Sequence, residues 1–264
     1  TSIIFEISFI VVSAIAAAYA RKLSDHFSMG LAGRYIYSNL TGGQSAGAVG
    51  TVAGQSIAAD LSAYYITDLN PATDIAVGIN ISNMGDKLSY TKIFDERGAD
   101  FIPINLRLGT CVGIKLDDYN RISIGVDMNK LLVPTPPVYD QMSQDSIIAG
   151  QDPDVSVVQA VFQSFGDAPG GIQEEWRELM YSIGFEYWYQ NQFAFRGGYF
   201  HEHDLKGGRK YFTMGAGLKM NVFALDFAYL VTASQNVRSP LENTMRFTLV
   251  FDIGAFTGGS NDEL

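Results

Sequence analysis

The fold is decided by the stretch Tyr181-Ser-Ile-Gly-Phe-Glu-Tyr-Trp-Tyr189, which continues after a turn at Asn191 as Phe193-Ala-Phe-Arg-Gly-Gly-Tyr-Phe-His201. In the first arm the odd positions are all apolar or aromatic, whereas the even positions hold Ser, Gly, Glu and Trp. Side chains on a strand alternate between two faces, so a period of two predicts one apolar face and one face that admits charge. The second arm repeats the alternation, and the pair is therefore predicted to be a β-hairpin.

The same alternation recurs along the rest of the chain. With the hairpin it predicts about eleven strands, many of which reach the length of about 9–11 residues that a tilted membrane strand needs. The first segment alternates less cleanly, and it is counted because it runs into a turn at Ser24-Asp25-His26. The strands predicted outside the hairpin cover residues 5–23, 27–38, 56–65, 74–82, 102–115, 122–129, 212–220, 223–232 and 244–253.

The connections between these strands alternate in length. Short turns are predicted near Asp25, Asn70, Asp118, Asn191 and Asn221, and longer loops at 39–55, 92–100, 130–178, 203–209 and 233–242. Short periplasmic turns and longer external loops are typical of barrels in an outer membrane. A soluble sandwich or barrel, the alternative, gives no reason for loops to be sorted in this way. The predicted fold class is all-β, a transmembrane antiparallel up-and-down β-barrel.

Composition and charge exclude several other classes of protein. The 264 residues are 47% hydrophobic and 12% aromatic, which is too apolar for a disordered chain. Ile3 to Ala20 is the nearest approach to a helical span or signal peptide, but it carries Glu6 and two serines. The lone Cys111 excludes an intramolecular disulfide framework. The net charge of −10 argues against nucleic-acid binding.

Charged residues on the polar faces of the strands are nearly balanced. A charge facing lipid would cost about 2–4 kcal/mol at the membrane midplane, so these residues are expected to line the lumen. The balance predicts cross-linked ion pairs and a narrow or plugged pore rather than an ion-selective channel. The six basic residues are Arg34, Arg107, Lys115, Arg196, Lys219 and Arg246, and the five acidic ones are Asp60, Asp127, Glu186, Asp226 and Asp252.

Residues 130–178 differ from an ordinary connection. Three prolines at 134–137 stiffen an extended chain, and between Leu131 and Glu178 eight acidic residues against one basic residue, Arg177, supply most of the negative charge. Val155, Val158, Phe162 and Phe165 recur at helical spacing after Asp154, a candidate N-cap. Three interpretations stay open: a solvated acidic loop, a helix that covers the barrel mouth, and a docking surface for another protein. The candidate partner-binding residues are Lys130, Leu132, Pro134, Pro136, Pro137, Tyr139, Val158, Phe162, Phe165 and Trp176.

Motifs of catalysis and of cofactor or metal binding are not found in the sequence. It lacks a nucleophile elbow, a P-loop, a dinucleotide fingerprint and zinc-ligand spacing. His201 and His203 lie two apart on one strand, where an interface pair is a simpler interpretation than a metal site. Asp226 and Glu186 are better explained as paired lumen charges than as an acid and a base. We therefore expect no enzyme, no cofactor and no metal site.

Several blocks, in order along the chain, resemble the PorV family of the type IX secretion system, which is itself similar to the FadL long-chain fatty-acid transporters. The resemblance implies fourteen strands, so that the N-terminal strands and the hatch would be missing from the eleven predicted here. It also implies a barrel over residues 1–256 with a long external loop at 130–178, followed by a tail at 257–264. The blocks are Ala20-Arg-Lys-Leu-Ser-Asp-His-Phe-Ser-Met-Gly-Leu31, Gly33-Arg-Tyr-Ile-Tyr-Ser-Asn-Leu40, Asn80-Ile-Ser-Asn-Met-Gly85, Pro103-Ile-Asn-Leu-Arg-Leu-Gly109, Asp127-Met-Asn-Lys-Leu-Leu-Val-Pro-Thr-Pro-Pro137 and Ser239-Pro-Leu-Glu-Asn-Thr-Met-Arg-Phe247.

The function that this resemblance implies is that of a non-enzymatic carrier in the bacterial outer membrane, with long loops at the cell surface. Such a carrier docks on the giant translocon barrel, receives cargo through its C-terminal signal domain, and delivers it to a sortase-like surface attachment complex. Its partners would be these proteins and outer-membrane lipid. Two alternatives stay open, a FadL-like transporter of hydrophobic small molecules and a purely structural barrel.

Overall fold

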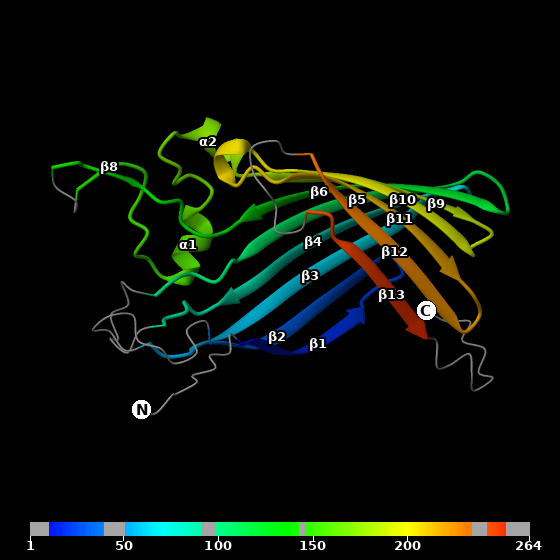
Figure 1. Ribbon diagram of the computed structural model, residues 1–264, viewed down its shortest axis with the longest axis horizontal. Helices are drawn as coiled ribbons and strands as arrows, with labels where there is room; N and C mark the ends of the chain where they lie inside the picture. Colours follow the sequence, from blue (N-terminus) through cyan, green and yellow to red (C-terminus); the bar gives the residue numbers. More distant parts are fainter. Residues whose placement is uncertain (1–10, 40–50, 91–98, 143–145, 234–241, 252–264) are drawn as a thin grey trace, which may run out of the picture. The chain divides into compact units, whose positions relative to one another are not determined.

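The structure, a computed structural model, describes residues 11–39, 51–90, 99–142, 146–233 and 242–251. Eleven strands of these ranges form one sheet, in which the strands follow one another in chain order (Figure 1). They are β1 (Val11–Lys22), β2 (Phe27–Asn39), β3 (Gly54–Asn70), β4 (Thr73–Gly85), β5 (Asn105–Lys115), β6 (Asn120–Leu131), β9 (Met180–Tyr189), β10 (Phe193–His201), β11 (Lys210–Lys219), β12 (Phe223–Thr232) and β13 (Met245–Phe251).

The predicted up-and-down arrangement of eleven antiparallel strands is confirmed. The predicted hairpin is β9 and β10, paired from Tyr189 opposite Phe193 to Tyr181 opposite His201. Residues 1–10, 40–50, 91–98, 234–241 and 252–264 lie outside the described residues, and so does the predicted start of the first strand at Phe5. The count of fourteen strands and closure into a cylinder stay predictions.

Local hydrogen bonds and residues that tolerate a left-handed backbone stabilise the short turns. Between β5 and β6, the Asp117 carboxylate accepts hydrogen bonds from the backbone N–H groups of Tyr119 and Asn120, both at 2.8 Å. Between β9 and β10, Gln190 and Asn191 adopt φ of 52° and 53°, the left-handed conformation that tight hairpin turns need. Asparagine tolerates this conformation better than most residues, which explains why Asn191 marked the turn.

The described residues divide into two compact units. Strands β3, β4, β5 and β6 each have residues in both units. Unit 1 comprises residues 1–64, 79–107 and 130–176, and unit 2 comprises residues 65–78, 108–129 and 177–264. Unit 1 contains β1, β2 and most of the segment that follows β6. Unit 2 contains β9 to β13 and the short turns at residues 70–73 and 115–120.

Unit 1 has a small apolar core. Ala58, Ile102, Ile104 and Leu132 are almost fully buried there. We predicted Ile102 and Ile104 as part of a strand, and this prediction is wrong, because β5 begins only at Asn105. Pro103 stands between them and cannot donate a ladder hydrogen bond. Instead, Ile104 O accepts from Leu132 N at 2.8 Å, which places both side chains in the core.

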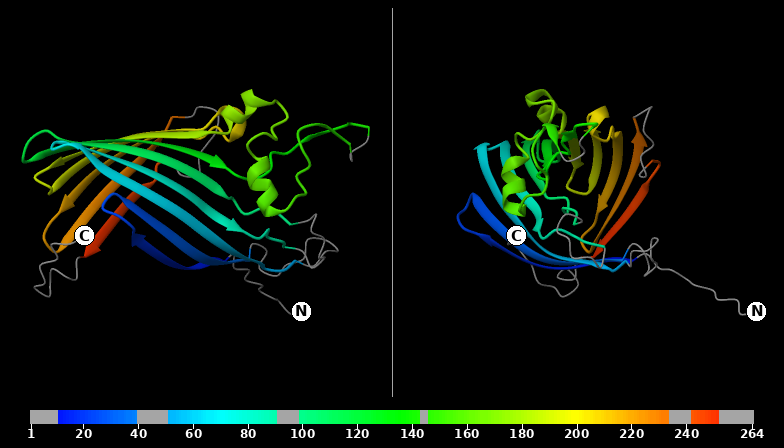
Figure 2. Two further views of the ribbon diagram at one scale, coloured as in Figure 1. Left: turned by 180° about the vertical axis from the view of Figure 1, so that it is seen from behind. Right: turned by 90° about the vertical axis from the view of Figure 1, so that its left-hand side faces the viewer.

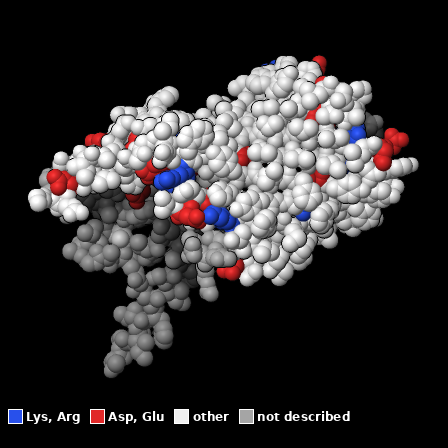
Figure 3. All heavy atoms as spheres, turned by 90° about the horizontal axis from the view of Figure 1, so that it is seen from above, with Lys and Arg blue, Asp and Glu red and all other residues white. Residues whose placement is uncertain are grey.

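The large apolar side chains of the strands are mostly exposed rather than buried. In β13, Phe247 is 70% exposed, and Ile183 of β9 and Phe195 of β10 are each about half exposed. Figure 3 shows few charged side chains on the face that it draws. A soluble protein rarely leaves contiguous apolar surface uncovered, so this distribution fits strands whose apolar face contacts lipid.

The helices of the described residues are short. None of them is long and apolar enough to cross a membrane, a result that concerns helices alone.

Candidate functional site

The segment of residues 130–178, which we call the loop segment, carries its own secondary structure. Its elements are β7 (Val138–Tyr139), β8 (Ile147–Ala149), α1 (Val157–Gln163) and α2 (Ile172–Arg177). Strands β7 and β8 pair antiparallel with each other. Figures 1 and 2 both show α1 beside the end of β4, within unit 1. The prediction of a helix in this segment is confirmed.

The start of α1 differs from the prediction. The N-cap is Ser156, whose side chain accepts a hydrogen bond from Gln159 N at 3.3 Å. Asp154, the predicted cap, instead forms an ion pair with Lys87 at 3.4 Å. Ser156 has the extended backbone of a capping residue, with φ −64° and ψ 155°. The two candidate caps lie only two residues apart, and the sequence pattern does not distinguish them.

Helix α1 packs against the apolar core of unit 1 through a different face from the one that the spacing of its large apolar residues indicated. Ala160 is fully buried, and Val157 and Val161 pack against the apolar core. Val158 and Phe162 are 69% and 75% exposed, and Phe165 beyond the helix is 53% exposed. The helix is therefore anchored by small and branched residues, and its large apolar side chains remain available for contact.

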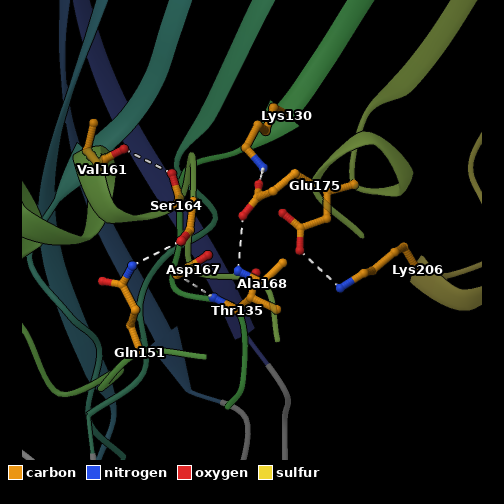
Figure 4. Close-up of polar contacts among 11 residues, drawn as sticks. Lys130, Thr135, Gln151, Val161, Ser164, Asp167, Ala168, Glu175 and Lys206 are labelled. Carbon is orange, nitrogen blue, oxygen red and sulfur yellow. Dashed lines mark hydrogen bonds and ion pairs between the residues drawn. The ribbon is translucent and has the colours of Figure 1, made fainter. Parts of the chain in front are cut away.

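A buried ion pair fastens the loop segment to the end of β6 (Figure 4). The Lys130 ammonium donates to Glu175 Oε2 at 2.9 Å, and Glu175 Oε1 accepts from Ala168 N at 3.0 Å. Both side chains are largely shielded from solvent, with 5% and 12% exposed. Glu175 thus joins β6, α2 and the turn before α2, and we call this group the Glu175 latch.

Further polar contacts brace the turn between the two helices. Asp167 accepts from Thr135 N at 3.0 Å, and the Ser164 hydroxyl donates to Val161 O at 2.9 Å. Gln151 donates to Gly166 O at 2.9 Å (Figure 4). Asp167 and Ser164 are almost fully buried. Because buried polar groups are costly without partners, these contacts specify one conformation of the segment.

Several acidic residues of the loop segment hold its turns rather than only facing water. Asp140 accepts from Met142 N at 3.0 Å, and Asp152 accepts from Asp154 N at 2.9 Å. Glu174 accepts from Gly170 N at 2.7 Å. These are side-chain-to-backbone contacts of the kind that stabilise turns. The negative charge of the segment therefore has a structural role.

The predicted partner-binding residues fall into two groups. Lys130, Leu132 and Pro137 are buried, and Pro134 is partly buried, so these four support the segment from within. The remaining six, Pro136, Tyr139, Val158, Phe162, Phe165 and Trp176, are exposed. The predicted set lacks five more exposed apolar residues of this segment, which lie outside the helical pattern that indicated α1: Leu131, Val138, Met142, Ile148 and Ile172.

Ion pairs link strands on their charged faces, as the sequence analysis predicted. In unit 1 the Arg34 guanidinium donates to Asp60 at 2.6 Å and to Asn83 Oδ1 at 2.5 Å. In unit 2, Arg121 contacts Asp74 at 2.7 Å. There Arg196 of β10 also donates to Glu186 on the neighbouring strand β9 and to Asp226 on β12, two strands away. The prediction of cross-linked charges is confirmed; a narrow or plugged pore stays a prediction.

A second braced feature lies in unit 2, in the connection between β10 and β11. Glu202 accepts from Arg209 Nε at 2.7 Å, from Arg209 Nη2 at 2.8 Å and from Arg209 N at 3.1 Å. Burial opposes ionisation of Glu202, but these hydrogen bonds and the charge of Arg209 outweigh it and lower the pKa of Glu202. The hydrogen bonds to Glu202 in turn raise the pKa of Arg209 against the effect of its own burial.

The two histidines of this connection have separate local roles. His203 Nδ1 accepts from Leu205 N at 3.2 Å and caps the short 3-10 helix Asp204–Lys206. His201 Nδ1 lies 3.4 Å from the Tyr199 hydroxyl. Within the described ranges, His, Cys, Asp and Glu side chains do not gather in groups of three or more that could hold a metal ion.

Comparison with known proteins gives one family. Residues 11–138 match the model of the family described as type IX secretion system protein PorV. The match covers β1 to β6 and ends at the start of β7, so most of the loop segment lies beyond it. No curated protein sequence matches the chain.

Two solved structures are similar to the chain at low sequence identity. The toluene transporter TbuX of Ralstonia pickettii gives a TM-score of 0.41 and 11% identity, over 91% of this chain and 65% of that one. The chain thus spans less than two thirds of the transporter. Outer membrane phospholipase A from Escherichia coli gives a TM-score of 0.36 and 10% identity, over 92% and 78% of the two chains. Neither similarity bears on function.

Proposed function

Since residues 11–138 match the model of the PorV family of the type IX secretion system, we propose that the chain is a non-enzymatic carrier of that system in the outer membrane. In this role it docks on the translocon barrel and binds the C-terminal signal domain of secreted cargo. It then delivers the cargo to the surface attachment complex. We propose the loop segment as the surface that holds the cargo.

The observation that carries this proposal is the group of exposed apolar side chains on a segment that is otherwise anchored. Met142 is 99% exposed, and Phe162 and Ile172 are each 75% exposed. Trp176 of α2 is 64% exposed. In the proposed orientation these large apolar and aromatic side chains lie outside the lipid, and such residues dominate the energetics of protein interfaces.

The anchoring of the segment supports a binding role further. A partner that binds a mobile loop must order it, at a cost of about 0.5–1.5 kcal/mol per immobilised side chain. The Glu175 latch, Asp167 and the packing of Val157 and Val161 order the backbone before any partner arrives. The exposed residues therefore stand on a largely pre-organised support.

A triple substitution on exposed residues tests the proposal directly. Phe162→Ser, Ile172→Ser and Trp176→Ser together remove exposed apolar area and leave the buried contacts of Ala160, Asp167 and Glu175 in place. We expect the affinity for a purified cargo signal domain to fall at least about tenfold, because a few large residues contribute most of an interface. The measurement is titration of the labelled domain against the solubilised full chain.

One control variant makes the result interpretable. Leu205→Ser removes an equally exposed apolar residue from unit 2, outside the loop segment, and should leave the affinity unchanged. Deletion of residues 141–170 is a poorer test, because it also removes the buried Ala160, Ser164 and Asp167. Unchanged cargo affinity in the folded triple variant would remove the loop segment from the mechanism.

A further inference from the structure

The charged face of unit 2 contains a hollow of about 590 Å³ that the carrier function does not use. Its floor includes Gly125, Gly184 and Gly198, which lie opposite one another on β6, β9 and β10. Without side chains in this row, the floor is bare backbone. A hollow of this volume falls in the range of about 300–1,000 Å³ that is usual for small-molecule sites.

An aromatic pair forms part of the lining. Phe200 and Tyr211 face each other across β10 and β11, with ring centroids 4.8 Å apart and planes inclined by 11°. Both contribute to the hollow. The Arg209 guanidinium lies over the Phe200 ring, 5.8 Å from its centroid, and the ring surface that lines the hollow next to the glycine floor is apolar, which suits a hydrocarbon chain.

The charges of the lining are not balanced. Arg196 is shared between Glu186 and Asp226, so its guanidinium is already engaged. Asp127 also lines the hollow, and it forms no hydrogen bond or ion pair within the part of the chain that the structure describes. Three carboxylates against one guanidinium give the lining a formal charge of −2.

Uncharged polar side chains lie next to Asp127 in the lining. Ser182 lies opposite Asp127 in the pairing of β6 with β9, and the hydroxyl of Ser123 and the thiol of Cys111 line the same hollow. A carboxylate flanked by hydroxyl groups is a good acceptor for a protonated amine, which has several N–H donors to distribute.

We propose that this hollow binds a small amphiphile with one protonated amine, which pairs with Asp127, and an apolar body that lies along the glycine floor toward Phe200 and Tyr211. The charge of the lining selects against the carboxylate of a fatty acid, because an anion would meet Asp127, and Arg196, the one guanidinium among the described lining residues, is already paired with Glu186 and Asp226. A neutral alcohol of the same length would gain the apolar contact alone. The site does not depend on the carrier function.

The test compares three probes that share a chain length and differ in their head group: dodecylamine, dodecanol and laurate. The chain has two tryptophans, so Trp176→Phe leaves Trp188 as the single fluorophore. Its ring lies 5.4 Å from the guanidinium of Arg196, which lines the hollow. Titrations use the full chain in lipid nanodiscs at neutral pH, below the concentration at which the probes form micelles.

We expect a saturable change of Trp188 emission with dodecylamine, and an affinity at least about tenfold higher than for dodecanol or laurate. Asp127→Asn should abolish this preference and leave the three probes within about threefold of one another. Asp118→Asn, in the exposed turn between β5 and β6, is the matched control and should behave as the parent.

A second variant keeps the test valid if Asp127→Asn folds poorly. A Cβ built on Gly125 meets no heavy atom closer than 3.8 Å, so Gly125→Val fits the sheet and fills the hollow. It should weaken binding of all three probes. Equal affinities, a preference for laurate, a preference that survives Asp127→Asn, or no saturable binding of dodecylamine would each overturn the proposal.

Discussion

At the scale of single residues, the charged face of the sheet is organised by arginines that each serve more than one acceptor. Arg34 reaches Asp60 and Asn83, and Arg196 reaches Glu186 and Asp226. The planar guanidinium can serve several oxygens with a fixed geometry, whereas a lysine acts as a single point of charge. Each arginine therefore ties together more than two elements of its unit.

Removal of Arg196 tests this organisation. Arg196→Met leaves the carboxylates of Glu186 and Asp226 without their shared partner, and we expect a loss of about 1–3 kcal/mol in the free energy of unfolding. The loss is moderate because each side chain is about a third exposed. The measurement is the urea concentration at which the heat-modifiable folded band disappears. Adding Glu186→Gln and Asp226→Asn should restore most of the stability, and no recovery would contradict the pairing.

The pair of Glu202 and Arg209 predicts a dependence on pH. The pKa of Glu202 in the folded chain is lowered from its ordinary value of 4.5, so the pair contributes stability at neutral pH. That contribution is lost as the pH falls below the ordinary value and through the lowered pKa. We expect Glu202→Gln to be less stable than the parent near neutrality, with a smaller difference in acid. Thermal unfolding followed at several pH values checks this, and parallel curves would contradict it.

Sequence reasoning at this scale identified the charged residues but not their partners. The alternation of Glu186 and Arg196 places both on the same face, and the hairpin register then makes them opposite neighbours. The contact of Arg34 with Asn83 could not be predicted in this way. Asn83 has a φ of 60°, a local departure from the strand that the period of two does not reveal.

At the scale of elements, α1 shows what a helical pattern predicts and what it leaves open. The spacing of Val158, Phe162 and Phe165 indicated a helix, and the helix exists. Its buried side is formed instead by Val157, Ala160 and Val161. The core formed by Ala58, Ile102, Ile104 and Leu132 is an unforeseen tertiary feature, because its members come from separate parts of the chain and the period within a strand does not show which parts meet.

Two leucine substitutions separate the buried and exposed sides of α1. Ala160→Leu inserts volume where Ala160 is fully buried, and we expect a cost of about 1–3 kcal/mol from overpacking. Val158→Leu, on the exposed side, should stay within about 0.5 kcal/mol of the parent. The rate of limited proteolysis within the loop segment reports the local opening, and it should rise only for Ala160→Leu. Equal cleavage of both variants would show that α1 is not anchored as described.

At the scale of the whole molecule, the apolar faces of the strands are exposed and their charges are gathered on the opposite faces. The period of two is local, so the sequence alone predicted the eleven strands and the faces of their side chains. The count of fourteen strands was implied by the family resemblance and does not follow from the described residues. The helix-bearing loop segment was located by its length and its prolines, but its anchoring depends on contacts far apart in the chain.

Neighbouring positions in β9 test the assignment of the two faces. Ile183 lies on the apolar face and Ser182 on the charged face. An arginine facing lipid near the membrane midplane costs about 2–4 kcal/mol, so Ile183→Arg should reduce the yield of folding into lipid vesicles much more than Ser182→Arg. The yield is read from the heat-modifiable band. Equal yields would contradict the lipid-facing role of the Ile183 side.

The glycine row in unit 2 has a mechanical consequence as well. Gly184 and Gly198 also line a second hollow of about 520 Å³, together with the apolar side chains of Ile183, Phe195 and Phe212. Between the two hollows the wall is a single layer of peptide groups, with few side chains to resist deformation on either side. We expect the sheet to bend most easily where side chains are absent, which is along the row of glycines that crosses β6, β9 and β10. A molecule bound in one hollow would then change the shape of the other hollow.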